Sequence, residues 1–358
     1  MYPILYCRKQ RRKLCTGMIL CSVLLRLLTS PAQTDRLIKT AKRAVQKLPV
    51  TELVMFFETG VKLTDSRQPL EAPTAPPAPP APTEPVTSTE TESLPETTEF
   101  PQPTEAPPET QSLQFTPDEA ENISFRGNCT YTVDKEALLA EPLCWTTPQQ
   151  GPQVLIIHSH TSESYTPSEG YEYEASGDYR TLDSSRSVVA VGDALAQSLE
   201  AAGIGVIHDT TCHDSPSYNS SYANARQTIE RELEAYPSIV MVIDVHRDAA
   251  EEIFRETAEI DGKTAAKLML VVGTDEGGLS HPFWEENLSC ALKLQALANR
   301  SYPGLFKSLA LRASRFNQDE TPASLIVEVG STGNTLPEAL TAADYLGNVI
   351  AELLDANR

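Results

Sequence analysis

The sequence predicts an α/β fold in which helices cover both faces of a mostly parallel sheet. After about residue 150, short β-branched apolar segments alternate with longer segments whose apolar residues recur at helical spacing. One short segment, 239–245 (IVMVIDV), is apolar enough to lie in the middle of a sheet that is covered on both sides. Alternation of strands and helices at these lengths is typical of parallel sheets.

We expect residues 119–358 to form one globular domain, since this length suits a single core of ordinary size. Its first strand is VLII, and the helix that follows should end at Gly203, because glycine commonly ends helices. The expected strands are 154–157, 205–208, 239–245, 268–272 and 325–329, and the expected helices are 188–202, 218–235, 284–299 and 337–354.

Residues 1–34 are expected to anchor the chain in a membrane. A basic cluster at 8–13 precedes a short apolar run at 14–28, which is the pattern of a signal-like segment. The run is shorter than the ~20 residues that a spanning helix needs, and Arg26 interrupts it. Because no convincing cleavage site follows, we favour an uncleaved anchor over a cleaved signal peptide. The basic cluster would stay in the cytoplasm, and the rest of the chain would lie outside.

Two further segments separate this anchor from the domain. Residues 35–67 have helical periodicity and are expected to form a membrane-proximal helical segment, divided at Pro49. Residues 68–118 are mainly Pro, Thr, Glu and Ala, without any Lys or Arg. Such a composition cannot bury enough apolar surface to offset the entropy of ordering, so we expect a disordered linker.

The charge argues against nucleic acid as a partner. The net charge is −20, and residues 119–358 carry 16 Lys and Arg against 36 Asp and Glu, whereas phosphate binding needs a cationic face. The cysteines of the domain form no C-x-x-C pair, so no thiolate metal site is predicted. A Cys129–Cys144 disulfide is one option, but we favour free, buried thiols.

Polar side chains that could do chemistry follow the first strand: His158, His160 and Glu163. His160 and Glu163 could both reach one cation if the chain turns there, and an imidazole and a carboxylate are good Zn²⁺ ligands. An isolated H-x-x-E is more often an ordinary polar loop. The pair therefore needs partners elsewhere in the chain.

A second group lies at the end of the central strand and consists of Asp244, His246, Arg247 and Asp248. Neighbouring strand ends meet at one edge of a parallel sheet, so His246 is expected beside His160. Either Asp244 or Asp248 could accept a proton from the second ring nitrogen and fix the tautomer of His246. The alternative is a histidine that merely caps a strand.

The third group centres on Glu328, which lies inside an apolar strand where an unpaired carboxylate is costly. Burial raises the pKa of a carboxyl, as a general acid or base near neutral pH requires. An ion pair with Arg312 or Arg315 is the structural alternative. Taken together, the three groups predict a hydrolytic Zn²⁺ site with Glu328 as the catalytic proton carrier and with the metal ligands His160, Glu163 and His246.

Four segments of residues 150–358 have a familiar pattern: VLIIHSHTSESY, GIGVIHDTTCHDSPSYNSSYANAR, VIDVHRDA and LIVEVGSTGNTLPEAL. In these segments the sequence resembles the stage II sporulation protein P family of endospore-forming bacteria. The resemblance implies a membrane-anchored peptidoglycan hydrolase between mother cell and forespore, with a fold similar to zinc N-acetylmuramoyl-L-alanine amidases. It also implies cleavage of the N-acetylmuramoyl–L-alanine amide and of peptide cross-links, alongside stage II sporulation proteins D and M.

The amidase motifs match this sequence at His160, His246 and Glu328. In those amidases a glutamate ligand begins the first helix, but here that position has Asp183 and Ser184. We therefore expect Glu163 to be the ligand, with Asp183 as its substitute. His158 competes with His160, although the strand phase favours His160. The remaining residues expected near the cleft are Arg247, His208, His213 and Asp214.

Two other functions fit the same sequence. One is a zinc carboxypeptidase or endopeptidase that acts only on stem peptides, because H-x-x-E followed by a distant histidine also suits peptide hydrolysis. The other is a non-catalytic scaffold that binds the cell wall.

Overall fold

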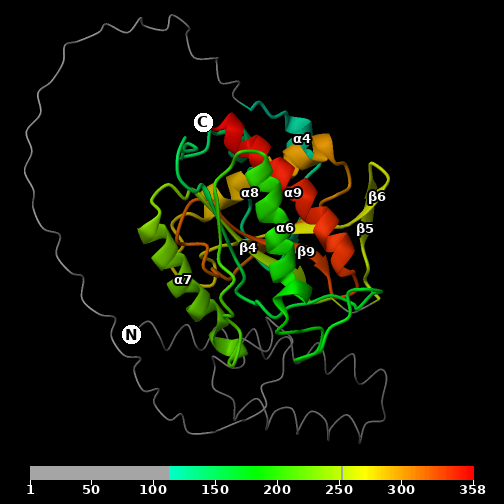
Figure 1. The fold of residues 1–358 in the computed structure, drawn as a ribbon. Coiled ribbons are helices and arrows are strands. Elements are labelled where there is room, and N and C mark those ends of the chain that lie inside the picture. Colours follow the sequence, from blue (N-terminus) through cyan, green and yellow to red (C-terminus); the bar gives the residue numbers. More distant parts are fainter. Residues whose placement is uncertain (1–112, 251–252) are drawn as a thin grey trace, which may run out of the picture. The chain divides into compact units, whose positions relative to one another are not determined.

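The computed structural model describes residues 113–250 and 253–358 (Figure 1). The expected anchor (1–34), the expected helical segment (35–67) and the expected linker up to residue 112 lie outside the described residues. Within the described part, no helix is both long enough and apolar enough to cross a membrane.

The core of the fold is a 7-stranded sheet in which every neighbouring pair is parallel except one. In spatial order the strands are β1 (Phe125–Gly127), β8 (Leu309–Arg312), β7 (Leu268–Gly273), β9 (Ser324–Ser331), β4 (Met241–Asp248), β2 (Val154–Ile157) and β3 (Val206–His208). The antiparallel pair β7–β9 joins two parallel blocks that run in opposite directions. The prediction of a mostly parallel sheet is confirmed.

Helices cover both faces, as the sequence predicts. Val154 and Ile156 of β2 point into the large core beneath α6 (Val188–Ala201), whereas Leu155 and Ile157 pack with Ala225 and Ile229 of α7 (Ser221–Ala235). This alternation follows from the period of two in a strand. In Figure 1, α6 runs beside α9 (Leu336–Ala356), and α7 lies apart from both. The remaining long helix, α8 (Trp284–Ser301), contributes to the same core as α6 and α9.

Local sequence explains where these helices begin and end. The side chain of Ser187 caps α6, and Gly203, with a φ of 81°, lies just beyond its end. At the start of α9, Thr335 and Glu338 form a capping box in which each side chain accepts a hydrogen bond from the other residue's backbone.

Several short elements were not expected from the sequence. They are α4 (Pro117–Glu121), β1, α5 (Lys135–Ala140), β8, and the hairpin of β5 (Thr257–Ile260) and β6 (Lys263–Ala266). The hairpin turns at Asp261-Gly262, both with positive φ (51° and 72°), a pair typical of a two-residue hairpin turn.

The described chain contacts the body ahead of the expected domain boundary at residue 119. Leu113 and Phe115 pack against the core, and Arg300 of α8 donates a hydrogen bond to the Gln114 carbonyl. Arg300 also pairs with Glu119, and its guanidinium lies 4.8 Å from the centre of the Phe115 ring.

The cysteines of the described residues are free, as expected. The expectation that these thiols are buried was wrong for most of them: among the described cysteines only Cys290 is buried, Cys129 is half-buried, and Cys144 and Cys212 lie in exposed loops.

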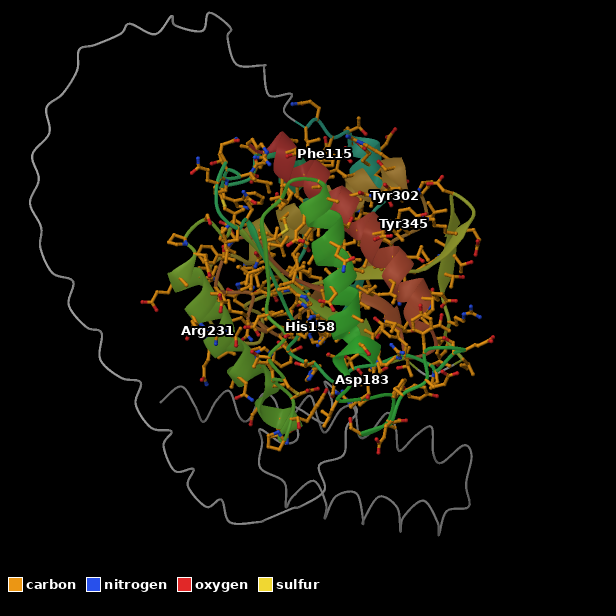
Figure 2. The ribbon with its side chains drawn as sticks, viewed as in Figure 1. Phe115, His158, Asp183, Arg231, Tyr302 and Tyr345 are labelled. Atoms are coloured by element: carbon orange, nitrogen blue, oxygen red, sulfur yellow. The ribbon has the colours of Figure 1, made fainter. Side chains whose placement is uncertain are left out.

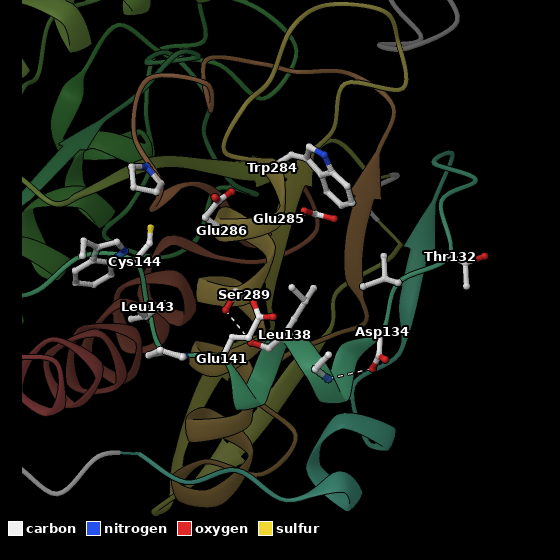
Figure 3. Close-up of a pocket in the computed structure, with 15 residues that line it drawn as sticks. Thr132, Asp134, Leu138, Glu141, Leu143, Cys144, Trp284, Glu285, Glu286 and Ser289 are labelled. Carbon is white, nitrogen blue, oxygen red and sulfur yellow. Dashed lines mark hydrogen bonds between the residues drawn. The ribbon is translucent and has the colours of Figure 1, made fainter.

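A cavity of about 380 Å³ lies between α5 and the start of α8 (Figure 3). Trp145, Trp284 and Leu138 contribute apolar surface, and Glu285 and Glu286 are among its acidic lining residues. The helix α8 follows the C-terminal end of β7, and β7 runs antiparallel to β9. The cavity beside the start of α8 therefore lies at the end of the strands where β9 begins.

Candidate functional site

The predicted polar groups of β4 and β9 lie side by side on the α7 face of the sheet. His246 and Glu328 are direct partners in the parallel β4–β9 pairing. Val242, two residues before Asp244, packs against α7, so Asp244 and His246 share that face. The expectation that β4 ends at Val245 was wrong: it runs to Asp248, because β9 continues to Ser331 and still pairs with it. His246 therefore projects from a strand, not from a loop beyond its end.

A turn after β2 brings His160 and Glu163 towards the same face. The backbone N–H of Glu163 donates to the carbonyl of His160 (3.1 Å). Residues 162–164 then pair with 179–181: Thr181 N donates to Ser162 O and Ser164 N donates to Tyr179 O, both at 2.9 Å. This backbone pairing fixes the position of Glu163.

The four predicted site residues meet around His246. Its Nδ1 atom lies 3.4 Å from Glu163 Oε2, and its ring is 5.3 Å from that of His160, nearly perpendicular to it. Its Nε2 atom lies 2.9 Å from Asp244 Oδ1, an ion-pair distance, although the angle is not that of a hydrogen bond. Of the two candidates for the partner carboxylate of His246, the structure thus places Asp244 in contact.

Burial and the neighbouring charges together set the pKa values of this cluster. Burial lowers the pKa of His246, but Asp244 and Glu163 outweigh it, so this pKa lies well above its ordinary value. Burial raises the pKa of Glu163, but the Arg247 charge and the His246 contact outweigh it and hold the pKa well below its usual range. Burial lowers the pKa of His160 to about 4. Without a metal, His246 is therefore a cation between two carboxylates, and His160 is neutral.

Glu328 is half-buried, and within residues 113–250 and 253–358 its carboxyl has no ion-pair partner. Its Oε2 atom is buried and has no hydrogen-bond partner among the described residues. Arg315, one of the two possible partners considered above, instead pairs with Asp319 at 3.0 Å. Burial raises the pKa of Glu328 to about 8, although the nearby His246 charge opposes the rise. This residue is therefore largely protonated at neutral pH and suited to proton transfer.

His158 lies on the opposite face of the sheet. Its Nδ1 atom is 3.1 Å from the Val245 carbonyl, and its Nε2 atom is 2.8 Å from Nε2 of His208. Both rings lie against Gly192 of α6, where an added Cβ would stand 2.5 Å from His208 and 2.7 Å from His158. His213 is also bound elsewhere, between the carbonyl of His158 and the hydroxyl of Thr228.

Asp183 and Asp248 are not among the contacts of the four site residues. The exposed carboxylate of Asp183 caps the turn that begins at Ser184 and accepts bonds from the backbone and hydroxyl of Ser185. Figure 2 shows Asp183 towards the periphery of the described body and His158 nearer its middle. Asp248 pairs with Lys307 at 3.3 Å.

Arg247 is in the site, and Asp214 borders it. The backbone N–H of Arg247 donates to Glu163 Oε2 (3.2 Å), and its guanidinium binds the carbonyls of Ser164 and Tyr179. Asp214 is buried and accepts bonds from the backbone and hydroxyl of Ser162.

Three residues at the site were missed by the sequence analysis. The ring of Tyr218 stacks on His160, Tyr222 of α7 meets the same ring edge-on at 5.3 Å, and Arg180 lies near Glu163. Tyr218 and Tyr222 lie in the segment GIGVIHDTTCHDSPSYNSSYANAR, which carries the family resemblance, but neither was assigned a role. Arg180 belongs to no recognisable motif.

The donor types at this site fit Zn²⁺, since two imidazoles and a carboxylate are a common ligand set. The buried Nδ1 of His160 has no hydrogen-bond partner among the described residues, and Nδ1 of His246 faces Glu163. The donors do not yet converge: within 113–250 and 253–358, no group of three or more His, Cys, Asp or Glu is arranged to hold a metal ion.

The model of the family "Stage II sporulation protein P (SpoIIP)" matches residues 71–351. The chain belongs to this family. It is 31% identical over 211 residues to stage II sporulation protein P of Bacillus subtilis (strain 168), a match that covers 56% of this chain. The matched part spans 50% of the length of that relative.

Solved structures of N-acetylmuramoyl-L-alanine amidases also match, with low scores. AmiC2 of Nostoc punctiforme is 13% identical and covers 57% of this chain and 96% of its own, with a TM-score of 0.32. Ami1 of Mycobacterium smegmatis is 11% identical and covers 59% of this chain and 99% of its own, with a TM-score of 0.34. These TM-scores are too low to support a conclusion about the site.

Proposed function

We propose that this chain is a zinc-dependent peptidoglycan hydrolase that cleaves the N-acetylmuramoyl–L-alanine amide during engulfment in sporulation. Membership of the stage II sporulation protein P family supports the sporulation setting. The observation that carries the chemistry is the Glu328 side chain beside His246, whose buried Oε2 atom has no hydrogen-bond partner among the described residues, with Glu163 in contact with His246. An unpaired carboxyl inside a sheet is destabilising, and its retention is expected where it transfers protons.

In this proposal His160, Glu163 and His246 hold Zn²⁺, which when bound acidifies a water molecule and polarises the amide carbonyl. Asp244 fixes the orientation of the His246 ring, so that its Nδ1 faces the metal side. The charge of bound Zn²⁺ would lower the pKa of Glu328, so that the ionised carboxylate could accept the proton of the attacking water and deliver it to the leaving amine. Such acid–base assistance contributes ~10²–10⁴ to a rate.

We also propose the setting of the reaction. Residues 1–34 would keep the chain in the membrane as a single-pass anchor, with the catalytic domain outside the cytoplasm, between mother cell and forespore. Stage II sporulation proteins D and M would act beside it. Cleavage of peptide cross-links by the same site is a second activity of this proposal.

The test uses the purified full-length chain, its metal content and the products that it releases from purified cell wall. About one Zn²⁺ per chain and glycan with free lactyl ends would support the amidase. New peptide amines without free lactyl ends would indicate the peptidase instead. A chain that holds no metal and releases neither product would contradict an enzyme and favour a wall-binding scaffold.

Glu328→Gln separates the role of the proton carrier from that of a ligand. Glutamine keeps the size of the side chain but cannot carry the proton, so the Zn²⁺ content should stay near one per chain while the rate falls by ~10²–10⁴. If this variant loses its metal and Glu163→Gln keeps it, Glu328 is a ligand and the proposed division of roles is wrong.

A further inference from the structure

We propose that Arg180 and Tyr218 are positioning residues that together hold His160 and Glu163, the two candidate ligands of the loop after β2. The inference deepens the proposed function, because it concerns the same site. Arg180 lies in the segment 179–181 that pairs with Glu163 and its neighbours. Tyr218 begins the short turn that precedes α7.

The guanidinium of Arg180 reaches both sides of the site. On one side its NH2 atom lies 3.6 Å from Glu163 Oε1. On the other, its NH1 atom donates to Asp214 Oδ2 (3.1 Å) and to the Ser162 hydroxyl (3.2 Å). A planar guanidinium with several donors can make such contacts at once in fixed geometry, which a lysine cannot.

Tyr218 extends this arrangement to His160. The guanidinium carbon of Arg180 lies 4.5 Å from the centre of the Tyr218 ring, a cation–π geometry. The same tyrosine ring stacks on His160 with a centroid distance of 4.4 Å and an angle of 7°. His160 therefore takes its ring plane from Tyr218, and Tyr218 is held in turn by Arg180.

Removing the Arg180 side chain should disturb mainly the loop that carries His160 and Glu163, because the carboxylates that Arg180 contacts lie in or beside that loop. Among the described residues, Arg180 and Arg247 lie within ion-pair distance of Glu163 together with the protonated His246, and Arg180 is also the partner of buried Asp214. Removing Arg180 leaves the Asp214 carboxylate buried without its cation, and such a group moves towards water. Asp214 binds Ser162, next to Glu163, so the loop that carries both candidate ligands should shift.

Residues that contact the ligands of a metal and orient them typically contribute to its binding, and their loss weakens the binding by ~10–100-fold. Arg180→Ala and Tyr218→Ala should weaken Zn²⁺ binding by about this factor and lower kcat with little change in KM. Tyr218→Phe keeps the ring and should behave as the wild type.

The decisive measurement does not depend on zinc. In the metal-free full-length chain with ¹³C-labelled histidine, the His160 ring proton signal, assigned by its loss in His160→Gln, senses the ring current of Tyr218. The signal should move in Tyr218→Ala and in Arg180→Ala and stay in place in Tyr218→Phe. The signal of His281, a buried histidine of another loop, reports whether each variant is folded.

Arg300→Ala is the matched control. Arg300 also pairs with a carboxylate and lies over an aromatic ring, but it belongs to the far end of α8. Its loss should change neither the His160 signal nor Zn²⁺ binding.

A His160 signal that stays in place in folded Arg180→Ala or Tyr218→Ala overturns the inference, whatever the zinc result. If the wild type holds no zinc but the signal moves as expected, the positioning role stands and the proposed function fails.

Discussion

Replacing Glu328 with Gln should stabilise the metal-free protein at high pH. The ordinary pKa of this carboxyl is 4.5, and burial raises it to about 8 in the folded chain. Between these pH values the folded state holds a proton that the unfolded state has released, so the free energy of unfolding falls as the pH rises. Above about pH 8 the loss is complete, because the folded carboxyl is then ionised as well.

The magnitude follows from the two pKa values. They differ by about 3.5, and a pKa difference of one is worth about 1.4 kcal/mol, so the loss can reach about 5 kcal/mol. Glutamine cannot ionise and escapes this loss. Relative to the wild type, Glu328→Gln should therefore gain stability between pH 4 and pH 9, by more than about 2 and at most about 5 kcal/mol.

Urea unfolding of the full-length chain in the presence of a chelator measures this difference, because the transition midpoint and slope give the free energy at each pH. Glu338→Gln is a control of opposite sign. Burial raises the pKa of Glu338, but the hydrogen bond from Arg255 outweighs it and the pKa lies below its usual value. Its contribution is present at neutral pH and lost in acid, so this variant should be destabilised most at high pH. A difference between Glu328→Gln and the wild type that is the same at pH 4 and pH 9 would refute the reasoning.

Three further outcomes are expected. Gly192→Ala should lower the free energy of unfolding by about 1–3 kcal/mol, measured as a lower Tm, because the new Cβ would overlap the histidine pair beneath α6. In Gly177→Ala the new Cβ meets only ordinary contacts, so the Tm should change little. Asp183→Asn should leave Zn²⁺ binding unchanged and Glu163→Gln should weaken it, because of these two carboxylates only Glu163 contacts His246. An equal loss of metal in both variants would make Asp183 a ligand. A fragment that starts at residue 113 should have a free energy of unfolding in urea about 1–3 kcal/mol higher than one that starts at residue 119, because the shorter fragment lacks the packed Phe115 side chain. Equal stability of the two fragments would show that the packing of Phe115 contributes nothing.

The sequence predicted the buried strands well because they carry their own signal. Residues 154–157 are apolar throughout and 239–245 are apolar except for Asp244, a composition typical of strands in a sheet that is covered on both faces. The edge strand β1 has only three residues, and its pairing with β8 depends on contacts between residues far apart in the chain. The direction of β7 could not be predicted, since the same apolar residues suit either direction of pairing. The Asp261-Gly262 turn was a signal that the analysis did not use.

The site residues on regular strands were likewise easier to predict than those on loops. The register of β4 and β9 follows from the strands, and with it the meeting of His246 and Glu328. Asp244 was one of two open choices, and only the side-chain geometry separates it from Asp248. Arg180 and Tyr218 reach the site through an irregular loop and a short turn, which periodicity does not describe. Contacts of this kind depend on the folded path of the chain and have no local signature.

The position of β1 at the edge of the sheet, three strands away from β9, has a mechanical consequence. Any pull transmitted along the chain from before residue 113 first loads the contacts of Gln114, Phe115 and Glu119 with Arg300, and then the short β1–β8 ladder. In the order of the sheet, β8 and β7 stand between this point of entry and β9, the nearest strand that carries a site residue. Strain at the attachment would be dissipated at an edge whose rupture leaves the β9–β4–β2 block intact. The body can thus bear tension at one border while the geometry of its histidines and carboxylates is preserved.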